Sequence, residues 1–204
     1  PSSLSTSRLC RISHSRPIFS LYNSLSSSSF SSSTSTSLYP SVFYLNTQKK
    51  VLPSPTINKI AQNRKLEKTF VNELGINTTD WVYIRSAEDI KKNQHLLPGI
   101  LKSNTLGYDG KGQFVLNSLD DVKQDWCFTK DYILEKKVDL KKEISVVITR
   151  YADGIMTIYE PIENVHKNQI LYKSKIPADI SDQIFTKAIN NAKKIAETFH
   201  MWAY

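Results

Sequence analysis

The segment Leu101-Lys-Ser-Asn-Thr-Leu-Gly-Tyr-Asp-Gly-Lys-Gly-Gln113 holds three of the six glycines in this 204-residue chain. Glycine loses more backbone entropy on ordering than any other residue, so a cluster favours a loop that needs positive φ angles or lies close to a ligand. The stretches on either side, 98–102 and 113–116, predict two short strands. The sequence therefore predicts a hairpin whose glycine-rich loop covers a phosphate, with Lys102 at a strand end directed toward that ligand.

Two common phosphate-binding patterns do not fit this loop. The spacing from Gly107 to Gly112 is that of a P-loop, but Gln113 stands where a P-loop needs Lys. A Rossmann pattern that begins at Gly110 meets Val115 where its third glycine belongs. On the loop alone, a hairpin turn formed only for its geometry remains an alternative to phosphate binding.

Charge is distributed unevenly along the chain, whose formal net charge is +8. No acidic residue precedes Glu67, and the cations before it equal the whole excess of positive charge. These cations are Arg8, Arg11, Arg16, Lys49, Lys50, Lys59, Arg64 and Lys65. The remainder is close to neutral, which argues against nucleic acid as a partner.

The cysteines and the apolar runs indicate a reducing compartment and no membrane contact. Cys10 and Cys127 are too few and too far apart for a disulfide framework or a zinc site. No apolar run approaches the roughly 18 residues of a membrane span. We therefore predict no zinc site and, by default, a cytoplasmic location.

Composition divides the chain into three regions. Residues 1–47 are rich in serine and free of acidic residues, so we predict a disordered tail. This composition also matches a transit peptide, which would place the protein in a plastid or another organelle, and a translated non-coding stretch is the alternative. Residues 48–76 are predicted to be a linker helix region, in which Thr56 caps one helix that continues to Gly75. Residues 77–204 form the main domain, in which helices alternate with strands.

The pattern of this domain predicts its elements. We expect strands over 81–84, 131–135, 144–149, 155–160 and 169–176, with a turn at Asp153-Gly154. We expect helices over 86–92 and 118–124, and a long helix that begins at Ser181-Asp182. The predicted buried stripe of that helix comprises Ile184, Ala188, Ile189, Ala192, Ile195, Ala196 and Phe199.

Further blocks accompany the glycine loop in a fixed order. They are Pro53-Ser-Pro55, Arg64, Ile133-Leu-Glu135, Lys142-Glu-Ile-Ser-Val146, Arg150-Tyr-Ala-Asp-Gly154, Tyr159-Glu-Pro161 and Glu163-Asn-Val-His166. From about Val51 to Tyr204 the chain resembles the ATP-grasp superfamily and, within it, the 5-(carboxyamino)imidazole ribonucleotide synthases. The resemblance implies an incomplete α+β ATP-grasp fold, in which two α+β lobes hold a nucleotide between them.

The resemblance also implies a set of nucleotide-binding residues. Glu143 would accept the ribose hydroxyls, segment 135–138 would meet the adenine edge, and Tyr108 and Asp109 would face the acceptor substrate. Lys102, Tyr108, Asp109 and Lys111 are the implied catalytic residues. The implied ATP contacts are Arg64, Lys102, Gly107, Tyr108, Asp109, Gly110, Lys111, Gly112, Gln113, Glu135, Lys136, Lys137, Val138, Glu143 and His166.

Each of the more isolated residues also has an ordinary interpretation. Arg64 on its own is a solvated helix cation, like Lys59, Lys65 and Lys68. Glu143 on its own is a solvent-facing strand residue paired with Lys141 or Lys142. His166 on its own is a surface or core histidine without a ligand.

The activity that the resemblance implies is carboxylation of 5-aminoimidazole ribonucleotide with bicarbonate, driven by ATP through carboxyphosphate. Family members hold Mg²⁺ through acidic residues that would lie beyond Tyr204, so we expect a fragment that is inactive alone. The resemblance also implies a homodimer at full length. The alternatives are a non-catalytic nucleotide-binding remnant and another ATP-grasp carboxylate–amine ligase.

Overall fold

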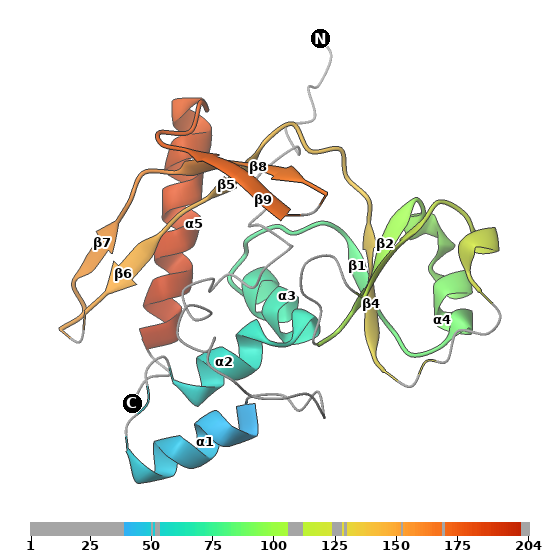
Figure 1. Cartoon of the computed structure of the whole chain (residues 1–204), viewed down its shortest axis with the longest axis horizontal. Coiled ribbons are helices and arrows are strands. Elements are labelled where there is room, and N and C mark those ends of the chain that lie inside the picture. Colours follow the sequence, from blue (N-terminus) through green and yellow to red (C-terminus); the bar gives the residue numbers. More distant parts are fainter. Residues whose placement is uncertain are drawn as a thin grey trace. The chain divides into compact units, whose positions relative to one another are not determined.

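The computed structural model describes residues 39–49, 51, 54–105, 112–123, 128, 130–151, 153–168 and 170–200. These residues form two compact units, which Figure 1 shows in a single view. The described residues up to Val138 form the N-terminal unit, and those from Asp139 onward form the C-terminal unit.

A four-stranded antiparallel sheet is the centre of the N-terminal unit. Its strands are β1 (Trp81–Ile84), β2 (Gly99–Ser103), β3 (Gln113–Leu116) and β4 (Tyr132–Lys136), in the order β1-β4-β2-β3. The strands predicted for this unit are thereby confirmed, and β2 pairs with β3 as the predicted hairpin requires. The hydrophobic core consists of Ile84, Ile90, Leu96, Leu101, Leu116 and Leu134.

The helices of this unit depart from the prediction in three places. The single helix predicted up to Gly75 is two helices, α2 (Pro55–Ala61) and α3 (Arg64–Glu73). The break occurs because the Asn63 side chain accepts from the backbone N–H of Leu66 at 3.0 Å and caps α3. The cap of α2 is Ser54 rather than Thr56.

The other two differences concern short segments. Helix α1 (Tyr39–Gln48) forms within the region predicted to be disordered, whose residues 1–38 lie outside the described part of the chain. The helix predicted over 118–124 shortens to one 3₁₀ turn, η3 (Leu119–Asp121). Helix α4 (Ala87–Lys92), followed by the 3₁₀ turn η2 (Gln94–Leu96), confirms the helix predicted at 86–92.

The C-terminal unit contains two small antiparallel sheets. One has the order β5 (Glu143–Ser145), β8 (Ile162–Lys167) and β9 (Ile170–Lys175). The other pairs β6 (Ile148–Arg150) with β7 (Met156–Ile158) around the predicted turn at Asp153-Gly154. The strand predicted over 144–149 is therefore two strands in different sheets, and β8 was not predicted.

Helix α5 (Asp182–His200) confirms the long predicted helix. Every residue of its predicted apolar stripe is buried or half-buried. Nη1 of Arg150 donates to the carbonyl of Ala196 at 2.9 Å, which joins β6 to the last turns of this helix. None of the helices in the described ranges is both long and apolar enough to cross a membrane.

The capping box of α4 predicts a pH effect on stability. Oδ2 of Asp89 accepts the backbone N–H groups of Arg85 at 2.8 Å and Ser86 at 3.0 Å. These bonds, the one from Arg85 above all, hold the pKa of the Asp89 carboxyl below its usual 3.8. Because the folded pKa is the lower one, Asp89 stabilises the fold above the unfolded pKa, and this contribution is lost as the pH falls through the folded pKa.

We therefore expect Asp89→Asn to make the fall in unfolding free energy below about pH 5 shallower than in the wild type. Urea denaturation at a series of pH values measures this slope. Ser86→Ala is the control, because it removes the other half of the box, worth about 1 kcal/mol, without removing a carboxyl group. If the unfolding free energy of Asp89→Asn falls below about pH 5 as steeply as that of the wild type, the proposed contribution of Asp89 is contradicted.

Candidate functional site

A buried group of charges joins the middle of the first sheet to α3. Lys102, fully buried on β2, donates from Nζ to Oε2 of Glu135 on β4 at 3.0 Å. The other carboxylate oxygen of Glu135 lies 3.6 Å from Nζ of Lys68 on α3. The side chains of Lys68 and Glu135 are 5% and 3% exposed. Two ammonium groups therefore share one carboxylate, and we call this the Lys68–Glu135–Lys102 cluster.

This cluster adds to one prediction and corrects another. Lys102 lies next to the end of β2, as predicted, and its buried ammonium group is bonded to Glu135, whereas its predicted contact with a ligand under the loop stays a prediction. Lys68 was grouped with the solvated helix cations, yet it is buried on α3 together with Val71, three residues later. The helical spacing of Lys68 and Val71 is the signal that would have placed Lys68 on the buried face.

Arg64 lies beside the same end of β2. Its Nε donates to the carbonyl of Ser103 at 3.0 Å, and its backbone N–H donates to the carbonyl of Asn104 at 2.9 Å. The side-chain oxygen of Asn104 accepts the N–H of Lys65 at 2.9 Å. The start of α3 is therefore tied to the residues that follow Lys102. Arg64 is half-buried and bonded, so it is not a solvated helix cation.

The glycine loop is described only at its C-terminal end. Gly112 has a φ of +72°, and a Cβ added there would lie 2.7 Å from Oγ of Ser103. The carbonyl of Gly112 accepts the N–H of Ser103 at 2.9 Å. Gln113 then pairs with Lys102 across the β2–β3 ladder. The predicted site residues Gly107, Tyr108, Asp109, Gly110 and Lys111 lie outside the described residues.

The segment predicted to meet adenine follows β4 directly. Glu135 is buried, while Lys136, Lys137 and Val138 are exposed. The N–H of Lys136 donates to the carbonyl of Asp80, and the N–H of Lys137 donates to that of Pro98, both at 2.9 Å. Because these two N–H groups already donate within the fold, a ligand here can bond only a carbonyl oxygen or an N–H group from Val138 onward.

In the C-terminal unit, β5 and β8 bring together Glu143 and His166. Nδ1 of His166 lies 3.2 Å from Oε2 of Glu143, and the two side chains are 20% and 14% exposed. Among the described residues, neither Nδ1 of His166 nor Oε1 of Glu143 has a partner in hydrogen-bond geometry. Buried polar atoms in native proteins nearly always have such partners, so this pair is suited to a polar ligand.

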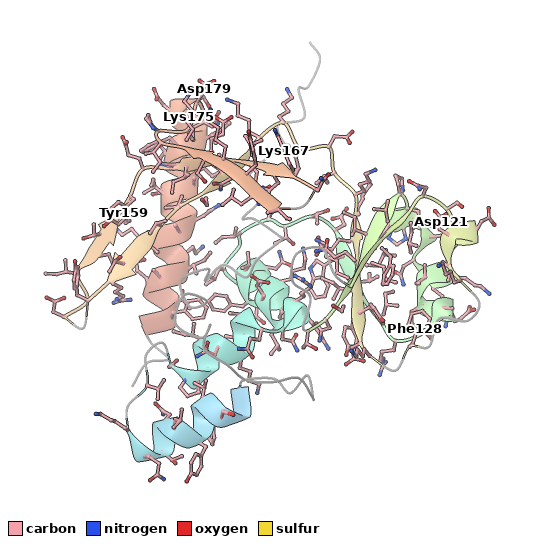
Figure 2. All side chains as sticks on the ribbon, in the orientation of Figure 1. Asp121, Phe128, Tyr159, Lys167, Lys175 and Asp179 are labelled. Atoms are coloured by element: carbon pink, nitrogen blue, oxygen red, sulfur yellow. The ribbon has the colours of Figure 1, made fainter. Side chains whose placement is uncertain are left out.

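Glu143 does not pair with Lys142, so that part of its ordinary interpretation is wrong. Nζ of Lys142 lies 2.9 Å from Oδ2 of Asp179 and 3.4 Å from Oε2 of Glu163. The hydrogen bond from Lys142, and then the charges of Lys142 and Lys175, lower the pKa of Asp179. Figure 2 shows Asp179 and Lys175 close together at one end of this unit.

Amide and hydroxyl bonds hold the strands that carry this pair. Nδ2 of Asn164 on β8 donates to Oγ of Ser145 on β5 at 2.9 Å, and Oγ of Ser174 on β9 donates to Oδ1 of Asn164 at 2.8 Å. Asn164 is also the cross-strand partner of Glu143. These bonds fix the register of all three strands around Glu143.

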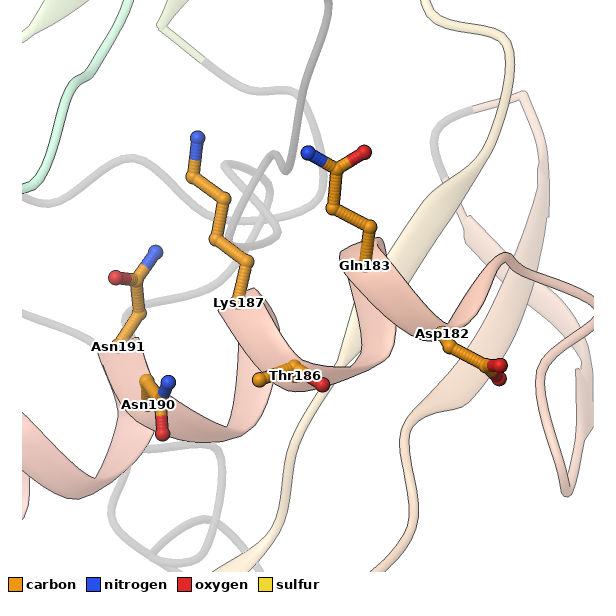
Figure 3. Close-up of a pocket in the computed structure, with 6 residues that line it drawn as sticks. All are labelled: Asp182, Gln183, Thr186, Lys187, Asn190 and Asn191. Carbon is orange, nitrogen blue, oxygen red and sulfur yellow. The ribbon is translucent and has the colours of Figure 1, made fainter.

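A hollow of about 530 Å³ along α5 contains none of these residues. Figure 3 shows its lining, which comes from one helix: Asp182, Gln183, Thr186, Lys187, Asn190 and Asn191. In the part of the chain that the structure describes, no three His, Cys, Asp or Glu side chains converge on a possible metal position.

Comparison with known proteins identifies similar chains. Residues 69–202 match the ATP-grasp domain family. N5-carboxyaminoimidazole ribonucleotide synthase of Brucella melitensis biotype 1 is 40% identical over 151 residues, which are 71% of this chain and 42% of the relative. The bifunctional purine synthesis protein purC/E of Dictyostelium discoideum is 38% identical over 166 residues, 77% of this chain and 16% of the relative.

The fold is similar to a crystal structure of the ADP complex of N5-carboxyaminoimidazole ribonucleotide synthetase. The TM-score is 0.73 and the sequence identity 32%, over 79% of this chain and 44% of that one. The chain therefore spans less than half the length of these three relatives.

The close approach of Gly112 to Ser103 leads to a stability prediction. Gly112→Ala should lower the unfolding free energy by about 1–2 kcal/mol for the positive φ alone, and by more because the new methyl group meets Oγ of Ser103. The double variant Gly112→Ala/Ser103→Ala should recover the loss of unfolding free energy that comes from the contact with Oγ, but not the loss that comes from the positive φ angle. Urea denaturation of both variants and of Ser103→Ala measures this. Additive effects in the double variant contradict the steric contact.

Proposed function

The chain belongs to the ATP-grasp domain family, and on this premise we propose that it is the nucleotide-binding part of an ATP-dependent ligase of purine biosynthesis. The reaction we propose is the carboxylation of 5-aminoimidazole ribonucleotide with bicarbonate. The buried Lys68–Glu135–Lys102 cluster beside the glycine loop carries the proposal, because it holds ammonium groups in place for a polyphosphate. The α+β fold and the identity of 40% to a relative with this enzyme name support it.

The proposed chemistry activates bicarbonate, which is a poor electrophile. A bicarbonate oxygen bonds to the γ-phosphorus of ATP as the bond from that phosphorus to the bridging oxygen breaks, giving carboxyphosphate and ADP. The amine of the ribonucleotide then attacks the carboxyl carbon, and inorganic phosphate leaves with the electrons of the broken C–O bond and takes the proton that the amine loses. The protein contributes mainly orientation and stabilisation of phosphate charge.

We assign the phosphates to the N-terminal unit. Lys102 has its ammonium group fixed by Glu135, so little reorganisation is needed when phosphate charge develops. Arg64 begins a helix that is tied to Ser103 and Asn104, next to Lys102 in sequence. The loop residues Gly107, Gly110, Gly112 and Gln113 would donate backbone N–H groups, Lys111 would add a cation, and Tyr108 and Asp109 would meet the ribonucleotide.

We assign the adenine edge to Val138 and the ribose to Glu143. The N–H groups of Lys136 and Lys137 are already used within the fold, which directs the adenine contact to Val138. Oε1 of Glu143 is buried and without a hydrogen-bond partner among the described residues, so it is available to accept a ribose hydroxyl. His166, 3.2 Å from the other oxygen of Glu143, would hold that carboxylate in place.

The proposal has three further parts. Mg²⁺ would neutralise phosphate charge, although the described residues supply no group of His, Cys, Asp or Glu side chains that fits it. The other two parts are a homodimer and a cytoplasmic or organellar location.

The ribose assignment predicts a selective loss of nucleotide affinity. We expect the wild-type chain to bind ADP more tightly than 2′-deoxy-ADP. Glu143→Ala should lower the affinity for ADP by about 10-fold or more and remove this preference, because a hydrogen bond to a charged acceptor is worth about 1.5–3 kcal/mol. Titration calorimetry measures both ligands. Glu163→Ala is the matched control, since Glu163 is on β8 and pairs with Lys142.

Two results bear on this prediction differently. A wild-type chain that binds no adenine nucleotide overturns the proposed function. A Glu143→Ala variant that still prefers ADP to its 2′-deoxy analogue overturns only the ribose assignment.

The reaction itself is tested in a protein that contains this chain and consumes ATP only when bicarbonate and 5-aminoimidazole ribonucleotide are both present. Lys102→Met should lower turnover by about 10²-fold or more, as does loss of one preorganised charge-stabilising group. The variant should remain folded, because Glu135 keeps Lys68 as a partner. Wild-type turnover in the Lys102→Met protein contradicts the placement of the phosphates.

A further inference from the structure

We propose that Lys68 is a positioning residue that preserves the positive charge of Lys102 for the phosphate groups of a nucleoside di- or triphosphate. It does so by sharing the carboxylate of Glu135. This inference rests on the proposed nucleotide binding. Lys68 is not among the residues that the sequence resemblance assigned to the nucleotide.

The geometry gives each ammonium group its own carboxylate oxygen. Nζ of Lys102 is 3.0 Å from Oε2 of Glu135, and Nζ of Lys68 is 3.6 Å from Oε1. Lys102 comes from β2, Glu135 from β4 and Lys68 from α3. Three different elements therefore meet at one carboxylate. The shorter distance is that of Lys102, which lies next to the last residue of β2.

The charges of the cluster explain why a second lysine matters. Lys102 and Glu135 alone would form a pair of zero net charge, and the field of Lys102 at a phosphate would be largely cancelled by the carboxylate 3.0 Å away. With Lys68 included, the three charges sum to +1. Since screening is weak where side chains are 0–5% exposed, this difference is felt strongly by an anion nearby.

The position of Lys68 on α3 links it to Arg64. The two residues are four apart, so they lie on the same face of the helix. Arg64 bonds the carbonyl of Ser103 on β2, and Lys68 reaches Glu135 on β4, so this face of α3 contacts both central strands. α3 thus delivers two cations to the region where Lys102 lies.

A purely structural role for Lys68, in which it only ties α3 to β4, is the competing interpretation. The two differ in what they require of the ligand. A structural role affects every ligand of the N-terminal unit alike, because α3 as a whole would shift. A charge role affects ligands according to their phosphates and leaves adenosine, which has none, unchanged.

The experiment compares Lys68→Met, Lys68→Arg and the control Lys65→Met in the full chain. Lys65 is an exposed lysine of the same helix, 4.3 Å from the centre of the Tyr83 ring, so its loss removes the same charge from α3 without touching Glu135. Calorimetry gives the Kd of ADP, competition against ADP gives that of adenosine, and thermal denaturation without ligand gives Tm.

We expect Lys68→Met to raise the Kd of ADP by about 10-fold, with adenosine affinity and Tm close to wild type, since Glu135 keeps Lys102 as a partner. Lys68→Arg should restore the ADP affinity to within about 3-fold, and Lys65→Met should change it by less than about 2-fold.

The inference is overturned if Lys68→Met leaves the Kd of ADP unchanged, or lowers the affinities for ADP and adenosine equally. It is also overturned if Lys68→Met lowers Tm strongly and Lys68→Arg restores Tm but not the ADP affinity. An equal rise in the Kd of ADP in Lys65→Met overturns it as well. If adenosine binds too weakly for competition, a wild-type Tm together with weakened ADP binding supports the charge role, and a lowered Tm contradicts it. A wild-type chain that binds no ADP overturns the proposed function instead.

Discussion

The N-terminal unit depends on the buried ion pair between Lys102 and Glu135. A buried charge is stable only when it has a partner, because loss of every partner leaves it desolvated at a cost of about 3–5 kcal/mol. The carboxylate of Glu135 has two ammonium partners, and Lys102 is paired with it because β2 and β4 are neighbours. The order β1-β4-β2-β3 places these two strands in the middle of the sheet. Buried ion pairs often contribute little net stability, so their retention suits a function that needs a charge in a fixed place.

The same constraint orients the helix that precedes the sheet. α3 begins at Arg64, after the capping residue Asn63, and its first residues bond Ser103 and Asn104 at the end of β2. The side chain of Lys68, one turn later, reaches the carboxylate of Glu135. The hairpin end, the helix start and the ion cluster are therefore one connected structure, in which a Cβ on Gly112 would lie 2.7 Å from Oγ of Ser103.

The C-terminal unit organises its polar groups differently. Glu143 and His166 lie on short strands whose register depends on side-chain hydrogen bonds among Ser145, Asn164 and Ser174. Here a carboxylate oxygen is left without a hydrogen-bond partner among the described residues, whereas Glu135 has an ammonium group at each oxygen. The N-terminal unit thus has two cations at one carboxylate, and the C-terminal unit has a carboxylate beside a histidine.

The sequence by itself determined the elements whose signals are local. The strands at 81–84 and 113–116 follow from alternation and composition, the capped helix at 87–92 from Ser86 and Asp89, and the helix at 182–200 from its apolar period. The order of motifs also indicated the family. Tertiary structure alone decided what each charged side chain touches. Lys102 and Glu135 are 33 residues apart, so no local pattern reveals their bond. Lys68 is buried because Glu135, brought there by sheet pairing, neutralises part of its charge, and Glu143 meets His166 rather than Lys142 because β8 pairs with β5. Pairing energies between distant charges depend on distance and burial, and only the folded chain sets these quantities.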